Sequence, residues 1–168
     1  VAKYFLPSGR SIHRSADNRG GIVPDIECPF EPTWTNEAFE KHRAASDFYA
    51  YSLPNWPKHK ETLMRLARFD GEDASQYPGF DAWYERLKVK TDRDSARRLL
   101  RQWLRVLAAD ENGRDWAGDL QEDNQLRRAV YEVGTKIPGL DMKTVPEYKG
   151  LAAEFGAKEK PAPAPVME

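Results

Sequence analysis

The serines that most invite a catalytic interpretation, Ser8 and Ser11, lie near the start of the sequence. Their segment reads Pro-Ser-Gly-Arg-Ser, which is not the Gly-x-Ser-x-Gly pattern of a nucleophile elbow, and no partnered base lies nearby in sequence. Serine and glycine are typical turn residues, so a turn is the favoured interpretation. We expect no catalytic residue in this chain.

Soft metal ligands are few and scattered in this sequence. His13, His42 and His59 share no metal-ligand spacing with one another or with Cys28, the single cysteine. We therefore predict neither a metal nor a cofactor site, and we expect Cys28 to be a small apolar residue at the end of a strand.

Four arginines, Arg97, Arg98, Arg101 and Arg105, follow the polar side of one predicted helix. Such a face could dock an acidic lipid or a partner. Lys and Arg number 26 against 27 for Asp and Glu, and this balance favours a solvated face paired with nearby carboxylates. The same balance argues against a dedicated nucleic-acid-binding protein.

Apolar residues recur at helical spacing through most of the sequence after residue 34. The strongest pattern runs from about residue 92 to 109, where one stripe holds Ala96, Leu99, Leu100, Trp103, Leu104 and Leu107, and where Thr91 with Asp94 forms a capping-box pattern. Further helices are predicted over residues 35–52, 57–70, 80–90, 119–137 and 144–155, with Pro54 and Pro57 breaking the chain between the first two.

The fold class that follows is mainly α. We expect a helical C-terminal module of about five or six helices, preceded by a short β segment. The five tryptophans are interpreted as core anchors for the helices: Trp34, Trp56, Trp83, Trp103 and Trp116.

The first 28 residues are extended in character. Residues 1–6 and 21–28 are rich in β-branched and aromatic residues, but two strands cannot bury a face alone, and Pro24 removes a ladder donor. We interpret residues 1–28 as the last strands of a larger sheet, 29–34 as a proline-containing linker and 157–168 as a disordered Pro/Ala-rich tail. No apolar run approaches the ~18 residues that a membrane span needs.

Two ordered motifs lie in this β segment. Residues 2–13 read Ala-Lys-Tyr-Phe-Leu-Pro-Ser-Gly-Arg-Ser-Ile-His, and residues 20–26 read Gly-Gly-Ile-Val-Pro-Asp-Ile. Together they resemble the closing signature of the carboxyl-terminal processing (tail-specific) serine peptidases, with His13 in place of the usual Gln. The family motif is carried by Pro7, Ser8, Gly9, Arg10, Ser11, Ile12, Gly21, Ile22, Pro24 and Asp25.

A weaker likeness lies at residues 119–130, Asp-Leu-Gln-Glu-Asp-Asn-Gln-Leu-Arg-Arg-Ala-Val. It is similar to the Asp-x-Gln-Leu-x-x-Ala helix that often follows the Pro-Asp strand and ends these enzymes. The resemblance implies that residues 35–118 form a helical insertion and residues 119–156 the closing helices.

The resemblance also implies a function for the parent protein. It would be an extracytoplasmic, typically periplasmic, serine endopeptidase that hydrolyses protein substrates through a Ser/Lys pair upstream of Val1, and this chain alone would be inactive. The implied partners are the upstream peptidase domain, its protein or peptide substrates and, in some arrangements, a homo-oligomer. The alternative is a self-standing helical protein–protein interaction module without catalytic activity, and the upstream sequence would separate the two.

Overall fold

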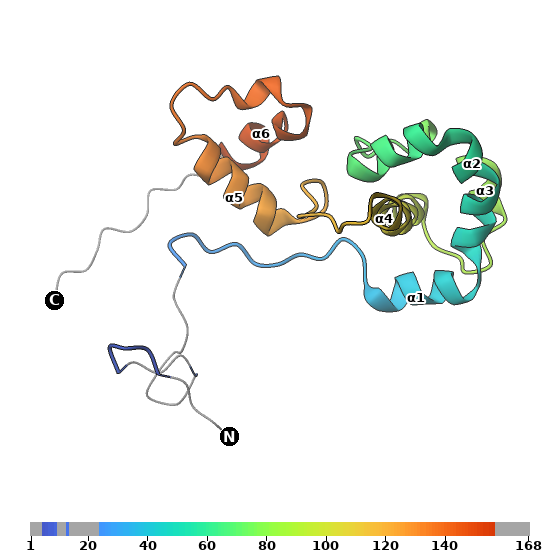
Figure 1. Cartoon of the computed structure of the whole chain (residues 1–168), viewed down its shortest axis with the longest axis horizontal. Helices are drawn as coiled ribbons and strands as arrows, with labels where there is room; N and C mark the ends of the chain where they lie inside the picture. The colour runs from blue at the N-terminus through green and yellow to red at the C-terminus, as the bar shows by residue number, and fades with distance from the viewer. Residues whose placement is uncertain (1–4, 10–12, 14–23, 157–168) are drawn as a thin grey trace.

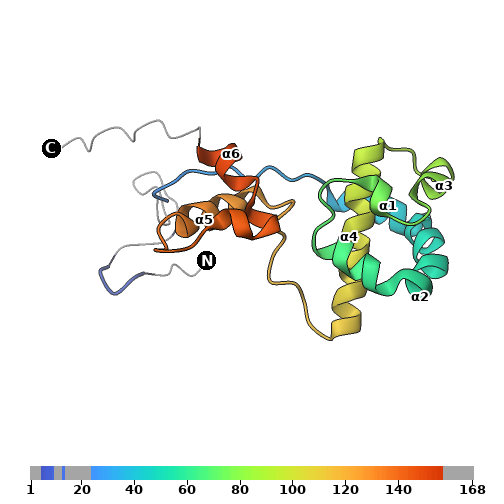
Figure 2. The same cartoon turned by 90° about the horizontal axis from the view of Figure 1, so that it is seen from above.

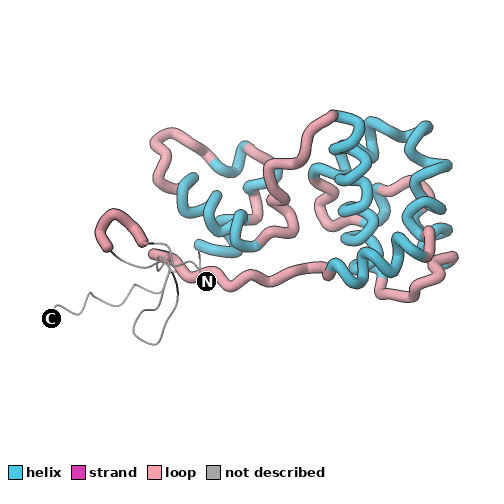
Figure 3. Tube along the Cα trace, turned by 60° about the horizontal axis from the view of Figure 1, so that its bottom comes forward, coloured by secondary structure: helices cyan, strands magenta, loops and turns pink. Residues whose placement is uncertain are grey.

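The computed structural model describes residues 5–9, 13 and 24–156 (Figure 1). Most of the predicted β segment and all of the predicted tail lie outside these residues. Within the described part the chain contains no β-strand, and the tube in Figure 3 runs through helices and loops only. A mainly helical fold is therefore confirmed, and no helix in the described part is both long and apolar enough to cross a membrane.

The described residues form six α-helices and three short 3-10 helices, joined by loops. In chain order they are α1 (Asn36–Ala44), α2 (Asp47–Arg68), η1 (Ala74–Gln76), α3 (Phe80–Glu85), α4 (Arg93–Asn112), α5 (Asn124–Gly134), η2 (Met142–Thr144), η3 (Pro146–Tyr148) and α6 (Leu151–Phe155). Figures 1 and 2 show two groups, with α1 to α4 packed together in one and α5 with α6 in the other.

The first predicted helix is two helices. Thr35 caps α1 as expected, accepting a hydrogen bond from the Ala38 N–H at 3.1 Å. The chain then turns at Ser46, whose φ of 64° is left-handed and ends the regular helix. A single helix over residues 35–52 is therefore wrong.

Helix α2 continues through the two prolines that were expected to break it. Pro54 and Pro57 both lie inside α2, and the non-helical residue is His59, with φ −130° and ψ 24°. A proline cannot donate to the carbonyl four residues earlier, so a helix that contains prolines kinks near them without having to end. The predicted break is displaced by two residues from Pro57.

Helix α3 is shorter than the predicted 80–90 because the backbone after it bonds elsewhere. The N–H groups of Lys88 and Val89 donate to the carboxylate of Asp47 at 3.0 and 3.2 Å. The Asp47 backbone carbonyl also accepts from the Trp83 indole at 2.8 Å. These contacts fix the end of α3 against the start of α2.

Helix α4 is the centre of the first group, and Figure 1 views it end-on with α1, α2 and α3 around it. Its predicted apolar stripe is confirmed, but the residue that caps it is Asp92, which accepts from the Ser95 N–H at 2.9 Å. Thr91 instead offers its carbonyl to the Tyr84 hydroxyl. The predicted capping box is therefore wrong by one position.

The core of the first group combines aromatic side chains with leucines and alanines. Phe48 is fully buried and stacks on Trp103 with ring centroids 5.5 Å apart. Trp83 is buried with it, and Trp34, Trp56 and Trp116 pack against the same core. The interpretation of the tryptophans as core anchors is confirmed.

The second group has its own small core of Tyr131, Leu151 and Phe155. Helix α5 begins at Asn124, not near residue 119, because Asp123 provides the cap by accepting from the Leu126 N–H at 2.9 Å. The predicted last helix over 144–155 is also shorter, since residues 142–148 form two 3-10 turns before α6.

Candidate functional site

The Pro-Ser-Gly segment forms a turn. The Gly9 N–H donates to the Leu6 carbonyl at 2.8 Å, and the φ of Gly9 is 78°, a conformation that favours glycine. Ser8 is exposed at this turn, and in the described residues its hydroxyl is bonded to no base. The predicted motif residues Arg10, Ser11 and Ile12 lie outside the described residues. So do Gly21 and Ile22 of the second motif.

The second motif ends in an exposed stretch of chain. Pro24 and Asp25 are both exposed, and among the described residues no hydrogen bond or ion pair joins either of them to an acid, a base or a nucleophile. Cys28 is half-buried, with its Sγ 3.7 Å from the Asn124 Nδ2. The motif residues are therefore not assembled into a catalytic site in the described structure.

The chain just after the second motif is bonded to the start of α5. Asn124 uses both ends of its side-chain amide, donating to the Pro29 carbonyl at 2.6 Å and accepting from the Glu31 N–H at 3.1 Å. Gln125 donates to the Cys28 carbonyl at 2.7 Å. The two sides of this junction are 93 to 97 residues apart in sequence. The chain therefore leaves the junction, builds α1 to α4, and returns to the same place.

Histidine plays a structural part in the first group. His42 is buried and its Nδ1 lies 3.0 Å from the Asp47 carboxylate, while His59 is exposed. No hydrogen bond in the described structure joins His42 to a serine hydroxyl, so a Ser/His/Asp arrangement is not formed there. The described residues contain no group of three or more metal-ligand side chains.

The basic side of α4 is buried, which corrects the expectation of a solvated face. Arg97 and Arg101 are each 1% exposed and Arg105 is 6% exposed, at successive four-residue steps along the helix. Of the four predicted arginines only Arg98, which lies beside this row of three, is substantially exposed. The expectation of carboxylate partners is confirmed, because all four arginines form ion pairs.

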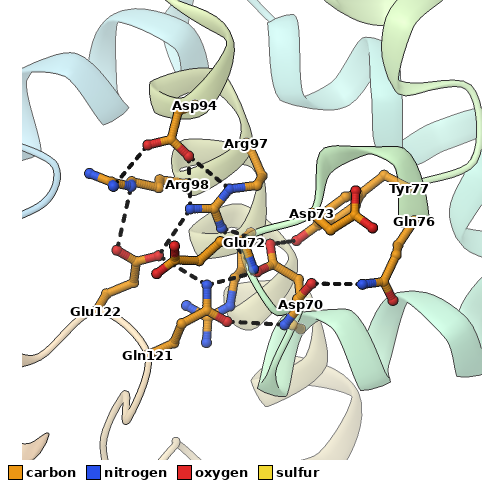
Figure 4. A network of polar contacts seen from close by, with 12 residues as sticks. Asp70, Glu72, Asp73, Gln76, Tyr77, Asp94, Arg97, Arg98, Gln121 and Glu122 are labelled. Atoms are coloured by element: carbon orange, nitrogen blue, oxygen red, sulfur yellow. Dashed lines mark hydrogen bonds and ion pairs between the residues drawn. The ribbon is translucent and has the colours of Figure 1, made fainter. Parts of the chain in front are cut away.

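Asp70, in the loop between α2 and η1, is the partner of Arg97 at the centre of this network (Figure 4). The Arg97 Nη1 donates to both carboxylate oxygens at 2.8 and 3.0 Å. The same carboxylate accepts from the Tyr77 hydroxyl at 2.6 Å, from the Gln121 Nε2 at 2.7 Å and from the Glu72 N–H at 2.8 Å. Asp70 is therefore a buried charge with every lone-pair direction in use.

Asp119 is the carboxylate partner of Arg101 and Arg105. Arg101 makes a bidentate pair with it, each of its two terminal nitrogens 2.8 Å from one oxygen. The Arg105 Nε lies 3.5 Å from the same carboxylate, and the Arg105 Nη2 donates to the Gly118 carbonyl at 2.7 Å. Asp70 in the loop before α4 and Asp119 in the loop after it are thus both bound to one helix.

The pKa values of the buried groups in this network reflect a competition between burial, which disfavours the charged form, and nearby opposite charges, which favour it. Burial lowers the pKa of Arg97 and of Arg101, but their carboxylate partners outweigh it and the net pKa of both is raised. Burial raises the pKa of Asp119, but Arg101 and Arg105 reverse this and the net pKa is lowered. Burial, with Asp70 next to it, raises the pKa of Tyr77, so its hydroxyl keeps its proton and stays a donor.

This network joins α4 to the loops that carry Asp70 and Asp119, and among the described residues the three buried arginines of α4 are engaged by carboxylates. The sequence patterns mark Asp70 as the end of a predicted helix and Asp119 as the start of both a predicted helix and the weaker family likeness, but they do not indicate that either residue or Gln121 contacts the arginines. One signal was present in the sequence: Arg97, Arg101 and Arg105 directly adjoin apolar residues of the stripe, so they border the buried side of the helix.

The chain matches no protein-family model, no curated protein and no solved structure.

Proposed function

We propose that this chain is the C-terminal part of a serine endopeptidase of the carboxyl-terminal processing kind. In this proposal residues 1–28 complete the peptidase sheet, and the Ser/Lys pair that hydrolyses the peptide bond lies upstream of Val1. The enzyme acts on protein substrates outside the cytoplasm. The chain described here supports the catalytic domain and carries no catalytic residue of its own.

The observation that carries the proposal is the pair of ordered motifs, Pro-Ser-Gly-Arg-Ser-Ile and Gly-Ile-Val-Pro-Asp, at family-like separation. The junction at Asn124 supports it independently. In the family resemblance the closing helix often comes shortly after the Pro-Asp strand, and here the start of α5 is bonded to residues 28–31 although Glu31 and Asn124 are 93 residues apart in sequence. That adjacency is what an insertion between two neighbouring framework elements would produce.

A second candidate, a self-standing helical interaction module without activity, is favoured by one observation. Helices α1 to α4 bury an aromatic core of their own around Phe48 and Trp103, as an independently folding unit would. The two candidates differ in what precedes Val1. A serine motif and a lysine motif within about one domain length upstream would support the peptidase, and their absence would support the module.

The direct experiment compares two polypeptides with one substrate, an unstructured protein with apolar C-terminal residues. The first is this chain alone and the second is the chain with its upstream sequence restored. We expect background cleavage from the first and turnover from the second, because a serine without a positioned base and an oxyanion hole lacks terms that each contribute several kcal/mol to catalysis.

The outcome that contradicts the proposal is equally concrete. Turnover by the chain alone that disappears in Ser8→Ala or Ser11→Ala would place the nucleophile here. Turnover by the longer polypeptide that survives substitution of every upstream serine would remove the proposed mechanism.

A further inference from the structure

A groove of about 780 Å³ lies between the linker, the second half of α4 and the loop that leaves α4. Its apolar lining includes Phe30 and Trp34 from the linker, Val106 from α4 and Trp116 from the loop. Phe30 is 61% exposed and Val106 is 38% exposed. Large apolar side chains left in water at a concave place are typical of ligand and partner sites.

The aromatic side of the groove is held in place. The Trp116 indole N–H donates to the Arg105 carbonyl at 2.8 Å, and the Arg105 guanidinium lies 4.7 Å from the ring centroid. Trp34 packs against the core of the first group, with Phe39 5.9 Å away between ring centroids. A rigid aromatic surface loses little conformational entropy when it binds a ligand.

Five carboxylates line the groove, and three of them are already engaged. Asp119 pairs with the buried arginines, Glu122 lies 3.5 Å from the Arg97 guanidinium, and Asp123 caps α5. Arginines balance the charges of Asp119 and Glu122, and the carboxylate of Asp123 is engaged by the backbone N–H that it caps.

The other two carboxylates have no such partner. Asp110 and Asp115 are exposed on the rim, and no ion pair or side-chain hydrogen bond reaches either of them in the part of the chain that the structure describes. Among the described residues that line the groove the one cation is Arg105, and it is occupied by Asp119 and by Trp116. The groove therefore joins an aromatic surface to two uncompensated negative charges.

We propose that this groove binds a lysine- or arginine-containing peptide segment of another protein. Its cationic side chains would pair with Asp110 and Asp115, and the stems of those side chains, with neighbouring apolar or proline residues, would lie on Phe30, Trp34 and Val106. The volume exceeds what a single small cation fills and lies in the usual range for ligand pockets. The proposal rests on this groove alone and does not depend on the peptidase assignment.

The test uses the full chain and fluorescence anisotropy with a labelled, lysine-rich, proline-containing peptide of about ten residues. A twin peptide with glutamate in place of lysine is the ligand control. We expect saturable binding of the lysine peptide only, weakened by added salt.

The decisive variant is Asp110→Asn with Asp115→Asn, which removes both free carboxylates. Its matched control is Glu61→Gln with Glu85→Gln, because these two exposed acids change the net charge equally but do not line the groove. We expect the affinity of the first variant to fall about tenfold, the effect of losing a charge-assisted contact, and that of the control to stay within about twofold. Circular dichroism should show both variants folded.

Three results would overturn the proposal. One is an equal loss in both double variants, which would mean non-specific attraction, and another is the absence of binding up to about 1 mM peptide. The third is evidence that this chain itself occupies the groove, seen either as tighter peptide binding after Lys158→Glu with Lys160→Glu or as a concentration-dependent dimer.

Discussion

Replacing Arg97 by Met should destabilise the fold far more than the same change at Arg98, one residue further along α4. Arg97 is 1% exposed and binds both oxygens of the buried Asp70. Met keeps the length and apolar stem of the side chain but removes the positive charge. Asp70 would then be a buried carboxylate with neutral donors only.

The size of the effect follows from what Asp70 retains. Removing one partner of a buried ion pair typically costs about 3 to 5 kcal/mol. Asp70 keeps the Tyr77 hydroxyl, the Gln121 amide and one backbone N–H, so the lower end, about 3 kcal/mol, is expected. For a chain of this size that corresponds to a fall in Tm of about 6 to 12 °C.

Arg98 supplies the matched control. Its side chain is 29% exposed and pairs with Asp94 at 2.8 Å on the rim of the network. Partly exposed pairs of this kind contribute about 0 to 1 kcal/mol, so Arg98→Met should lower the free energy of unfolding by no more than that.

Chemical denaturation of four chains tests the cause as well as the size: the natural one, Arg97→Met, Asp70→Asn and the double variant. In the Asp70→Asn background no buried negative charge is stranded, so Arg97→Met should cost at least about 1 kcal/mol less than in the natural chain. Equal costs in the two backgrounds would refute the reasoning, and so would equal costs for Arg97→Met and Arg98→Met.

Three further outcomes are expected. Phe48→Ala should lower the free energy of unfolding by about 3 to 5 kcal/mol, because the side chain is fully buried and its loss opens a cavity against Trp103. A loss below about 1 kcal/mol in denaturant unfolding would mean that the core closes over the cavity. Asp92→Ala should cost about 1 kcal/mol and Thr91→Ala much less, since only the first removes the α4 cap, and a reversed order would restore the sequence-based assignment. Folding lowers the pKa of Asp119, so its contribution to stability is full above pH about 4 and is lost as the pH falls through the folded pKa. The difference in Tm between the natural chain and Asp119→Asn should therefore narrow from pH about 6 to about 2. A constant difference in Tm would show that the charge of Asp119 is not what stabilises the fold.

The sequence predicts the helices better than it predicts their limits. The stripe from Ala96 to Leu107 identified α4 because the pattern is local, with every relevant residue inside one helix. The turn at Ser46 could not be placed, since Asp47 beside it is held by the distant Lys88 and Val89, and the two prolines indicate a kink in α2 but not its position at His59. Propensity at one or two positions is a weak signal beside such contacts.

The arginine network illustrates the same limit for the candidate site. That Arg97 and Arg101 would have acidic partners was foreseeable from charge balance, but which carboxylates these are was not. Their partners lie 27 and 18 residues away in sequence, in loops that no periodic pattern directs toward α4. Only the folded chain brings Asp70 and Asp119 to the helix.

The junction at Asn124 also has a consequence for the order in which the chain folds. Joining residue 31 to residue 124 in an unfolded chain closes a long loop, and the entropy lost grows with the logarithm of the loop length. Contacts among α1 to α4 close shorter loops than this, since Trp83 bonds to Asp47 and Arg97 to Asp70 across 36 and 27 residues of sequence. If they form first, they replace most of the flexible loop by a compact body whose two ends already lie close together. We expect the hydrogen bonds of Asn124 to form late in folding, and substitutions there to accelerate unfolding while leaving the folding rate nearly unchanged.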